Sequence, residues 1–196
     1  INFLYPGLIC AHSVWLDEKD IMALAKHDVK ISHNPVSNMK LSVGSALPYE
    51  LMRKHRLTIS LGTDGTASNN SLDMFDTMKF AALLQKHHTN MQTTMPAREV
   101  FRMATLGGAE TLGIRAGEIK EGSLADIALI DLKKPEMRPG HNLVSDLVYS
   151  ANGSCVDTVI IDGKLVMENR KVEGEEDILD KATEAGLALV SKSRKD

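Results

Sequence analysis

Residues 57–70 read LTISLGTDGTASNN, and this stretch decides how the chain folds. Its apolar, β-branched beginning predicts a buried strand over Leu57–Thr63. The strand delivers Asp64 to its carboxyl end, with glycines nearby on both sides that give the backbone room. Burying a carboxylate costs free energy unless a metal, a histidine or a substrate proton pairs with it. Asp64 is therefore the first candidate functional residue.

Two earlier segments repeat this design. Residues 8–11 (LICA) run into His12, and residues 29–32 (VKIS) run into His33. The carboxyl ends of parallel strands face one common site, so we expect these two histidines and Asp64 to converge. A histidine beside a carboxylate can transfer a proton, and either group can bind a metal. For each residue taken alone, the alternative is a hydrogen-bonded side chain at the end of a strand.

Strands alternate with helices through the first 113 residues. Helical periodicity is found over Asp17–His27 and Leu47–His55, and again after Pro96. Another helix is expected to begin at Asn70 or Ser71, burying an apolar face made of Leu72, Phe75, Met78 and Ala82. Residues 35–44 are expected to be a loop, because proline, serine and asparagine break both periods. The alternation predicts an α/β fold with parallel strands and right-handed crossovers.

The pattern changes near Gly117. Leu124–Leu132 predicts an apolar strand, and Val156–Val166 predicts a hairpin that turns at Asp162-Gly163. No helix is expected between these strands, which indicates a separate antiparallel element. Residues 175–192 predict a closing helix with an apolar stripe at Ile178, Ala182, Ala185 and Leu189. We therefore expect three parts, over residues 1–116, 117–174 and 175–196.

Composition excludes several classes of function. The chain has 196 residues, is 43% hydrophobic and carries a net charge of −3, without a basic cluster for nucleic acid. No apolar run approaches the roughly 20 residues that span a membrane, and no signal peptide is evident. Cys10 and Cys155 are expected to be free thiols in a reducing cytoplasm. Because Ile1 replaces an initiator methionine, we expect the native start to lie elsewhere.

Other polar residues follow the predicted strands. Asn38 and Lys40 either contact a substrate or fix their loop, and Asn38 and His33 are the candidate substrate-binding residues. Asn69-Asn70 is interpreted as a helix cap, with bracing of the Asp64 loop as the alternative. His87-His88 is interpreted as a solvated helix end, because adjacent histidines diverge on a helix.

Three of these motifs resemble a known family. AHSVWLDEKDI (11–21), SHNPVSNMKLSVG (32–44) and LGTDGTASNNSLDMF (61–75) are similar to the amidohydrolase superfamily. They most closely resemble its branch that deaminates 5'-methylthioadenosine, S-adenosylhomocysteine and 5'-deoxyadenosine. The similarity continues to about residue 172. Chlorotriazine hydrolases and guanine deaminases share parts of it.

The resemblance implies a metal-dependent (β/α)8 barrel with a small β-sandwich. This chain would be its C-terminal portion, with about three βα units and part of the sandwich. Asp64 would be the metal-ligating aspartate and would take a proton from the metal-bound water. His12 would lie near that water and help to move protons. The metal would be zinc, with iron as an alternative, and the substrate a small nucleoside.

One departure from the family pattern is decisive. The family's first strand carries an H-x-H pair that binds the metal, and this sequence contains no H-x-H. A catalytic zinc needs about three protein ligands, of which only Asp64 is identified here. We therefore expect an incomplete deaminase that cannot catalyse alone and that needs its missing N-terminal half or forms a homo-oligomer. The alternatives are a non-catalytic subunit that completes a barrel with another chain, and a related hydrolase acting on a heteroaromatic ring.

Overall fold

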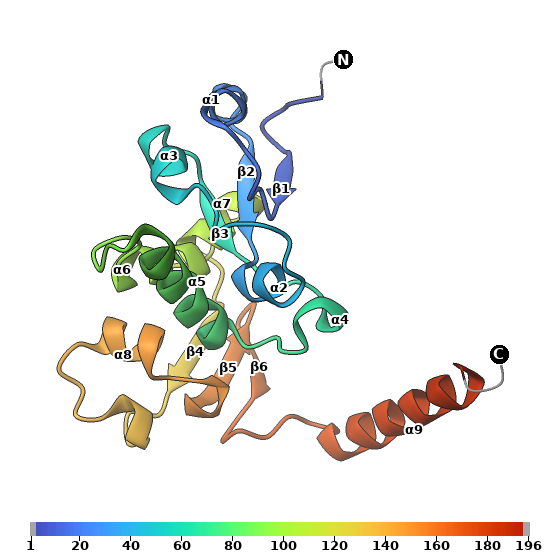
Figure 1. Ribbon diagram of the computed structural model, residues 1–196. Coiled ribbons are helices and arrows are strands. Elements are labelled where there is room, and N and C mark those ends of the chain that lie inside the picture. The colour runs from blue at the N-terminus through green and yellow to red at the C-terminus, as the bar shows by residue number, and fades with distance from the viewer. Residues whose placement is uncertain (1–2, 194–196) are drawn as a thin grey trace.

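Two three-stranded sheets organise the residues that the computed structural model describes, 3–193. The first sheet is parallel, in the order β1 (Ile9–Ala11), β2 (Lys30–His33), β3 (Ile59–Leu61). The second is antiparallel, in the order β4 (Ile127–Ile130), β5 (Val156–Ile161), β6 (Lys164–Met167). Figure 1 shows the second sheet lying below the carboxyl ends of the first. The predicted strands and their division into a parallel and an antiparallel set are confirmed.

The crossover from β1 to β2 is the helix α1 (Glu18–Lys26), close to the predicted span. It begins with a capping box, in which the Asp20 backbone N–H donates to the Asp17 carboxylate (2.9 Å) and the Asp17 N–H donates to Asp20 (3.2 Å). The helix buries Ile21 and Leu24 against the sheet. A local sequence signal therefore sets where this helix begins.

The prediction of a loop over residues 35–44 was wrong. Its first part is the helix α2 (Pro35–Lys40), which is followed by α3 (Tyr49–Lys54) before the chain enters β3. Pro35 occupies the first helical position, where no backbone N–H is required and the fixed φ of proline suits the helix. Ser37 and Asn38 are buried on this helix, so tertiary contacts offset their poor helix propensity.

Four helices follow β3: α4 (Thr66–Asn69), α5 (Met74–Thr89), α6 (Ala97–Ala104) and α7 (Leu106–Leu112). The predicted cap of α5 was wrong, because Asp73 is the N-cap and accepts the Phe75 N–H at 2.8 Å. Asn70 instead ends α4, with φ of 70°. Leu72 precedes α5 and is 65% exposed, contrary to expectation, whereas Met78 and Ala82 are buried as predicted.

One hydrophobic core joins the parallel sheet to its helices. It is formed by side chains from β2, β3, the helices α1, α3, α5 and α6, and a later helix, α8 (Leu143–Tyr149). Its fully buried members include Ile21, Ile31, Met52, Ala81 and Val100. Helices α5 and α6 lie beside β3, as Figure 1 shows. This core fixes the carboxyl edge of the sheet on which the candidate residues stand.

The second sheet differs from expectation in one respect. The hairpin turn at Asp162-Gly163 is confirmed, with positive φ at both residues, as a tight two-residue turn requires. However, the helix α8 (Leu143–Tyr149) lies between β4 and β5, where none was expected, together with two short 3-10 turns, η1 (Pro135–Met137) and η2 (Gly153–Cys155). Its N-cap Asn142 accepts the Ser145 N–H (3.1 Å), and α8 packs on α5 and α6. This packing connects the two sheets.

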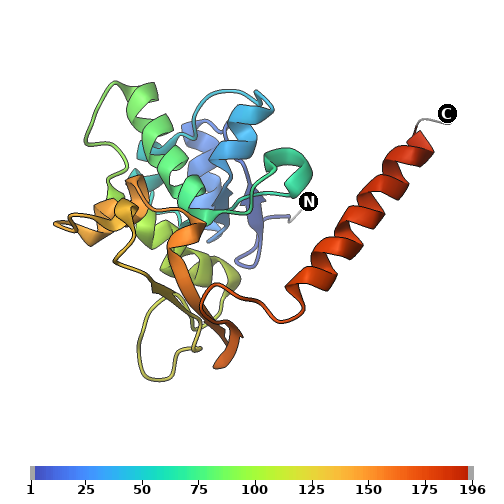
Figure 2. The ribbon, with the colours of Figure 1, turned by 90° about the horizontal axis from the view of Figure 1, so that it is seen from below.

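The last helix, α9 (Glu175–Ser193), confirms the prediction of a closing helix. It stands away from the rest of the molecule in both views (Figures 1 and 2), and its apolar stripe is exposed, with Ile178 at 57% and Leu189 at 71%. None of the helices in residues 3–193 has the length and apolar character needed to cross a membrane. Cys10 and Cys155 are both free; the former is half-buried and the latter buried.

The contact between α7 and β3 generates a prediction about stability. A Cβ added at Gly107 would lie 2.7 Å from the Ile59 carbonyl oxygen, whereas one at Gly108 would meet nothing within 4 Å. We expect Gly107→Ala to lower the free energy of unfolding by about 1–3 kcal/mol, because the backbone of β3 must move. Gly108→Ala on the same helix should be neutral or raise it by up to about 1 kcal/mol. Urea unfolding followed by circular dichroism measures both variants, and equal effects would contradict this packing.

Candidate functional site

The candidate site lies at the carboxyl edge of the parallel sheet. His12 follows β1, His33 is the last residue of β2, and Asp64 follows β3. The pairing of Ala11 with Ser32 and of His33 with Leu61 brings these strand ends level. As a result, the His12 Nε2 atom lies 4.0 Å from the Asp64 Oδ2 atom. The structure therefore brings the two predicted catalytic side chains together.

Both candidate catalytic residues have unusual backbone conformations. His12 has a φ of 66° and Asp64 a φ of 61°, in the left-handed region that non-glycine residues seldom occupy. Backbone hydrogen bonds hold the adjacent chain, since the His12 N–H donates to the Ser32 carbonyl (2.9 Å) and the Gly62 N–H donates to the His33 carbonyl (2.9 Å). Residues held in this region cluster at functional sites, where surrounding contacts offset the strain.

The Asp64 carboxylate accepts two short hydrogen bonds. The Ser37 hydroxyl donates to its Oδ2 atom at 2.6 Å, and the Gly65 backbone N–H donates to its Oδ1 atom at 2.7 Å. The bond from Ser37 is the main reason that the pKa of Asp64 lies below its ordinary value, and the bond from Gly65 is the second. Asp64 is therefore ionised at neutral pH.

His12 is held from the other side of its ring. Its Nδ1 atom lies 2.7 Å from the Oδ1 atom of Asn38, a residue that is only 5% exposed. The His12 ring itself is 41% exposed, so its Nε2 edge is open beside Asp64. The predicted substrate-binding residue Asn38 thus contacts a candidate catalytic residue.

His33 lies beneath this pair and is completely buried. Neither of its ring nitrogens has a hydrogen-bond partner among the described residues. Burial, with a smaller contribution from the nearby His12, lowers the pKa of His33 to about 4, so the ring is neutral at physiological pH. A role for His33 in substrate binding stays a prediction.

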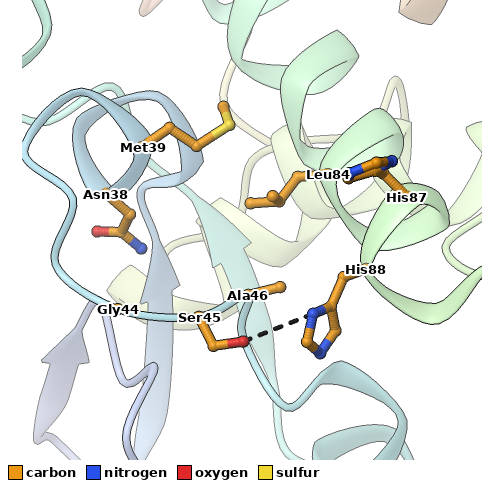
Figure 3. A pocket seen from close by; sticks show the side chains of 8 residues that line it. All are labelled: Asn38, Met39, Gly44, Ser45, Ala46, Leu84, His87 and His88. Atoms are coloured by element: carbon orange, nitrogen blue, oxygen red, sulfur yellow. Dashed lines mark hydrogen bonds between the residues drawn. The ribbon is translucent and has the colours of Figure 1, made fainter.

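A pocket of about 390 Å³ lies between α2, the loop that follows it and α5. The residues that line it are Asn38, Met39, Gly44, Ser45, Ala46, Leu84, His87 and His88. In Figure 3 the amide nitrogen of Asn38 faces this space, while the rings of His87 and His88 point in different directions. His88 contacts the Ser45 hydroxyl at 3.5 Å. Asn38 therefore lines this pocket and also contacts His12.

Asn69 and Asn70 brace the loop around Asp64 and do not cap α5. The Asn69 side chain donates to the Thr63 carbonyl (2.7 Å), and Lys40 donates to the Ala67 carbonyl (3.3 Å) and to the Asn70 side chain. The capping interpretation was wrong because Asp73 already caps α5. Sequence reasoning also missed Ser37; the proline that begins α2 was the signal that could have placed it on a helix.

Comparison with known proteins identifies the family. Residues 2–166 match the profile of the amidohydrolase family. The chain belongs to this family. The match covers the parallel sheet, the antiparallel sheet except for the last residue of β6, and every residue of the candidate site.

Named relatives of this amidohydrolase chain include deaminases. It is 50% identical over 196 residues to 5-methylthioadenosine/S-adenosylhomocysteine deaminase 1 of Archaeoglobus fulgidus, covering 98% of this chain and 46% of the relative. It is 45% identical to the 5'-deoxyadenosine deaminase of Methanosarcina mazei, and the alignment covers 98% of this chain and 45% of that relative. The crystal structure of an adenosine deaminase from Xanthomonas campestris with bound zinc matches with a TM-score of 0.88 and 36% identity, covering 92% and 42%. The chain thus spans less than half the length of these relatives.

The zinc in that relative supports a divalent metal for the family, but the residues described here do not form a complete metal site. Among residues 3–193, no three histidine, cysteine, aspartate or glutamate side chains are grouped so that they could hold one ion. Asp64 supplies a single carboxylate, and its neighbour His12 one imidazole. Because a catalytic zinc takes about three protein ligands, these residues do not fit a zinc site by themselves.

The burial of His33 generates a prediction about acid stability. A histidine whose pKa is lower in the folded than in the unfolded chain contributes stability above about pH 6.5, which is lost as the pH falls towards 4. One pKa unit corresponds to about 1.4 kcal/mol, so we expect the free energy of unfolding to fall by on the order of 3 kcal/mol over this range.

Replacing His33 with leucine should remove this component of the pH dependence, because no buried ring is left to protonate. Urea unfolding at pH 7, 5.5 and 4.5 measures it. The matched control is His141→Leu at an exposed loop position, which should keep the pH dependence of the unsubstituted protein. If His33→Leu and the unsubstituted protein lose stability in parallel, His33 is already charged or exposed.

Proposed function

We propose that this chain is the C-terminal part of a hydrolytic deaminase of adenosine-type nucleosides. The substrates proposed are 5'-methylthioadenosine, S-adenosylhomocysteine and 5'-deoxyadenosine, which the names of the relatives mention. The observation that carries the proposal is the His12–Asp64 pair, 4.0 Å apart, at the carboxyl edge of a parallel sheet. This edge is where catalytic residues of α/β barrels are found.

The pair suits the proton transfers of a hydrolytic deamination. In this reaction water adds to the purine carbon that bears the amino group, and ammonia leaves. A proton must leave the water and another must reach the departing amine. Asp64 is the acceptor, because its hydrogen bonds to Ser37 and Gly65 favour the ionised form. The exposed Nε2 edge of His12 stands beside it and completes the path for the proton.

The proposal includes a cofactor and a partner. A divalent metal, zinc or alternatively iron, would be bound by Asp64 together with ligands from outside this chain. Those ligands would come from an N-terminal half or from another copy in a homo-oligomer, and the isolated chain would be inactive. The three parts over residues 1–116, 117–174 and 175–196, and a cytoplasmic location, belong to the same proposal.

The proposed function is tested by substituting Asp64 in the complete protein, of which this chain would be the C-terminal part. We expect Asp64→Asn to lower kcat for ammonia release from the three nucleosides by at least about 100-fold, because the amide cannot accept the proton. Asp28→Asn is the matched control: Asp28 also has a positive φ, of 53°, and pairs with Lys30 far from the site. It should leave kcat unchanged.

Three outcomes would contradict the proposal. Equal activity of Asp64→Asn and the unsubstituted protein would show that Asp64 takes no part in the reaction. Hydrolysis of a chlorotriazine or of guanine without deamination of the three nucleosides would favour a related amidohydrolase. A complete protein without any of these activities would favour a non-catalytic subunit.

A further inference from the structure

Helix α2 supplies a neighbouring pair of side chains to the two candidate catalytic residues. Ser37 donates its hydroxyl proton to Asp64 at 2.6 Å, and the next residue, Asn38, contacts His12 at 2.7 Å. Both Ser37 and Asn38 are at least 95% buried. One short helix therefore touches both members of the pair.

The contact with Asn38 defines the chemistry of the His12 ring. The Oδ1 atom of an amide only accepts hydrogen bonds, so the Nδ1 atom of His12 carries the proton and donates it. In the neutral ring the lone pair then lies on Nε2, the atom that is 4.0 Å from Asp64. Without this acceptor, the ring can rotate about its side-chain bonds and can carry its proton on either nitrogen.

The backbone around Asn38 is itself fixed. The Asn38 N–H donates to the Asn34 carbonyl (3.0 Å), and the Asn38 carbonyl accepts the Val43 N–H (3.1 Å). The Val43 carbonyl accepts the indole N–H of Trp15 (2.9 Å), which stands three residues after His12. The segment that follows His12 and the segment that follows Asn38 are thus tied to each other, so the distance between the two side chains is held by more than their own contact.

We propose that Asn38 is a positioning residue that holds the His12 ring with its proton on Nδ1 and its Nε2 atom towards Asp64. Its catalytic consequence rests on the proposed function. The proposed orientation of the His12 ring rests only on its contact with Asn38 and on the burial of Asn38. This role differs from the substrate contact expected from the sequence, although the amide nitrogen of Asn38 borders the pocket of Figure 3 and has no partner among the described residues.

The first test distinguishes the effect of losing the acceptor oxygen of Asn38 from the effect of changing the volume of its side chain. Asn38→Leu keeps a similar volume without an acceptor, and Asn38→Asp keeps the acceptor. In the complete protein we expect Asn38→Leu to lower kcat by about 10- to 100-fold, as is usual when a partner of a catalytic side chain is lost. KM should stay within about threefold, and Asn38→Asp should recover most of the loss. Val36→Ala, on the same helix but outside the lining of this pocket, is the matched control and should behave like the unsubstituted protein.

A raised KM with unchanged kcat in Asn38→Leu would overturn the proposal in favour of a substrate contact. Unchanged kcat and KM would also overturn it. If the unsubstituted protein deaminates none of the three nucleosides, the proposed function fails, and the next measurement then decides the positioning role alone.

The second test determines from the NMR spectrum which nitrogen of the His12 ring carries the proton. In protein labelled with ¹⁵N-histidine, the His12 nitrogens are assigned by their disappearance in His12→Gln. We expect a proton on Nδ1 in the unsubstituted protein, and no fixed preference between the two ring nitrogens in Asn38→Leu. A proton on Nε2 in the unsubstituted protein would overturn the proposal, and this spectrum is decisive even where Asn38→Leu does not fold.

Discussion

Parallel pairing of β1, β2 and β3 is the constraint on which the remaining structure depends. Because parallel neighbours need long crossovers, each strand is followed by helical segments that return the chain to the opposite edge of the sheet. The polar residues after the strands are therefore gathered at one edge, although they are far apart in sequence. A shift of one residue in the pairing of Ala11 with Ser32 would turn every side chain of β1 to the other face.

The backbone conformation at the site costs folding free energy. Contacts with neighbouring elements offset this cost. His12 and Asp64 both have left-handed φ values, each of which costs of the order of 1–3 kcal/mol. The carboxylate of Asp64 is held by Ser37 and Gly65, and the ring of His12 by Asn38. Packing of α2 against α4 and α5 keeps this helix in the position from which it makes two of these contacts. Stability and chemistry are thus coupled through one short helix.

Two apolar surfaces of the structure are exposed, and under the proposed function they would be covered in the complete deaminase. Ile9 on the edge strand β1 is 40% exposed, and the apolar stripe of α9 faces outward. The described residues supply one carboxylate and one imidazole where a zinc site takes about three ligands. The chain spans less than half the length of the relatives named above. The proposed function accounts for these observations together, because an N-terminal half or a second copy would both add metal ligands and cover these surfaces.

The sequence by itself determined the two sheets, the helices over the α1 and α9 segments, the hairpin at Asp162-Gly163, and the candidates His12 and Asp64. These features depend on local periodicity, turn chemistry and the residue that follows each strand. Only the tertiary structure decided that residues 35–40 are helical, that Asp73 caps α5, and that Ser37 and Asn38 contact the candidate pair Asp64 and His12. The contacts from Ser37 and Asn38 join residues 27 and 26 positions apart, and they form only when the crossover packs on the sheet. Helix propensity cannot reveal them, because burial of polar side chains against specific partners outweighs the local preference of serine and asparagine for turns.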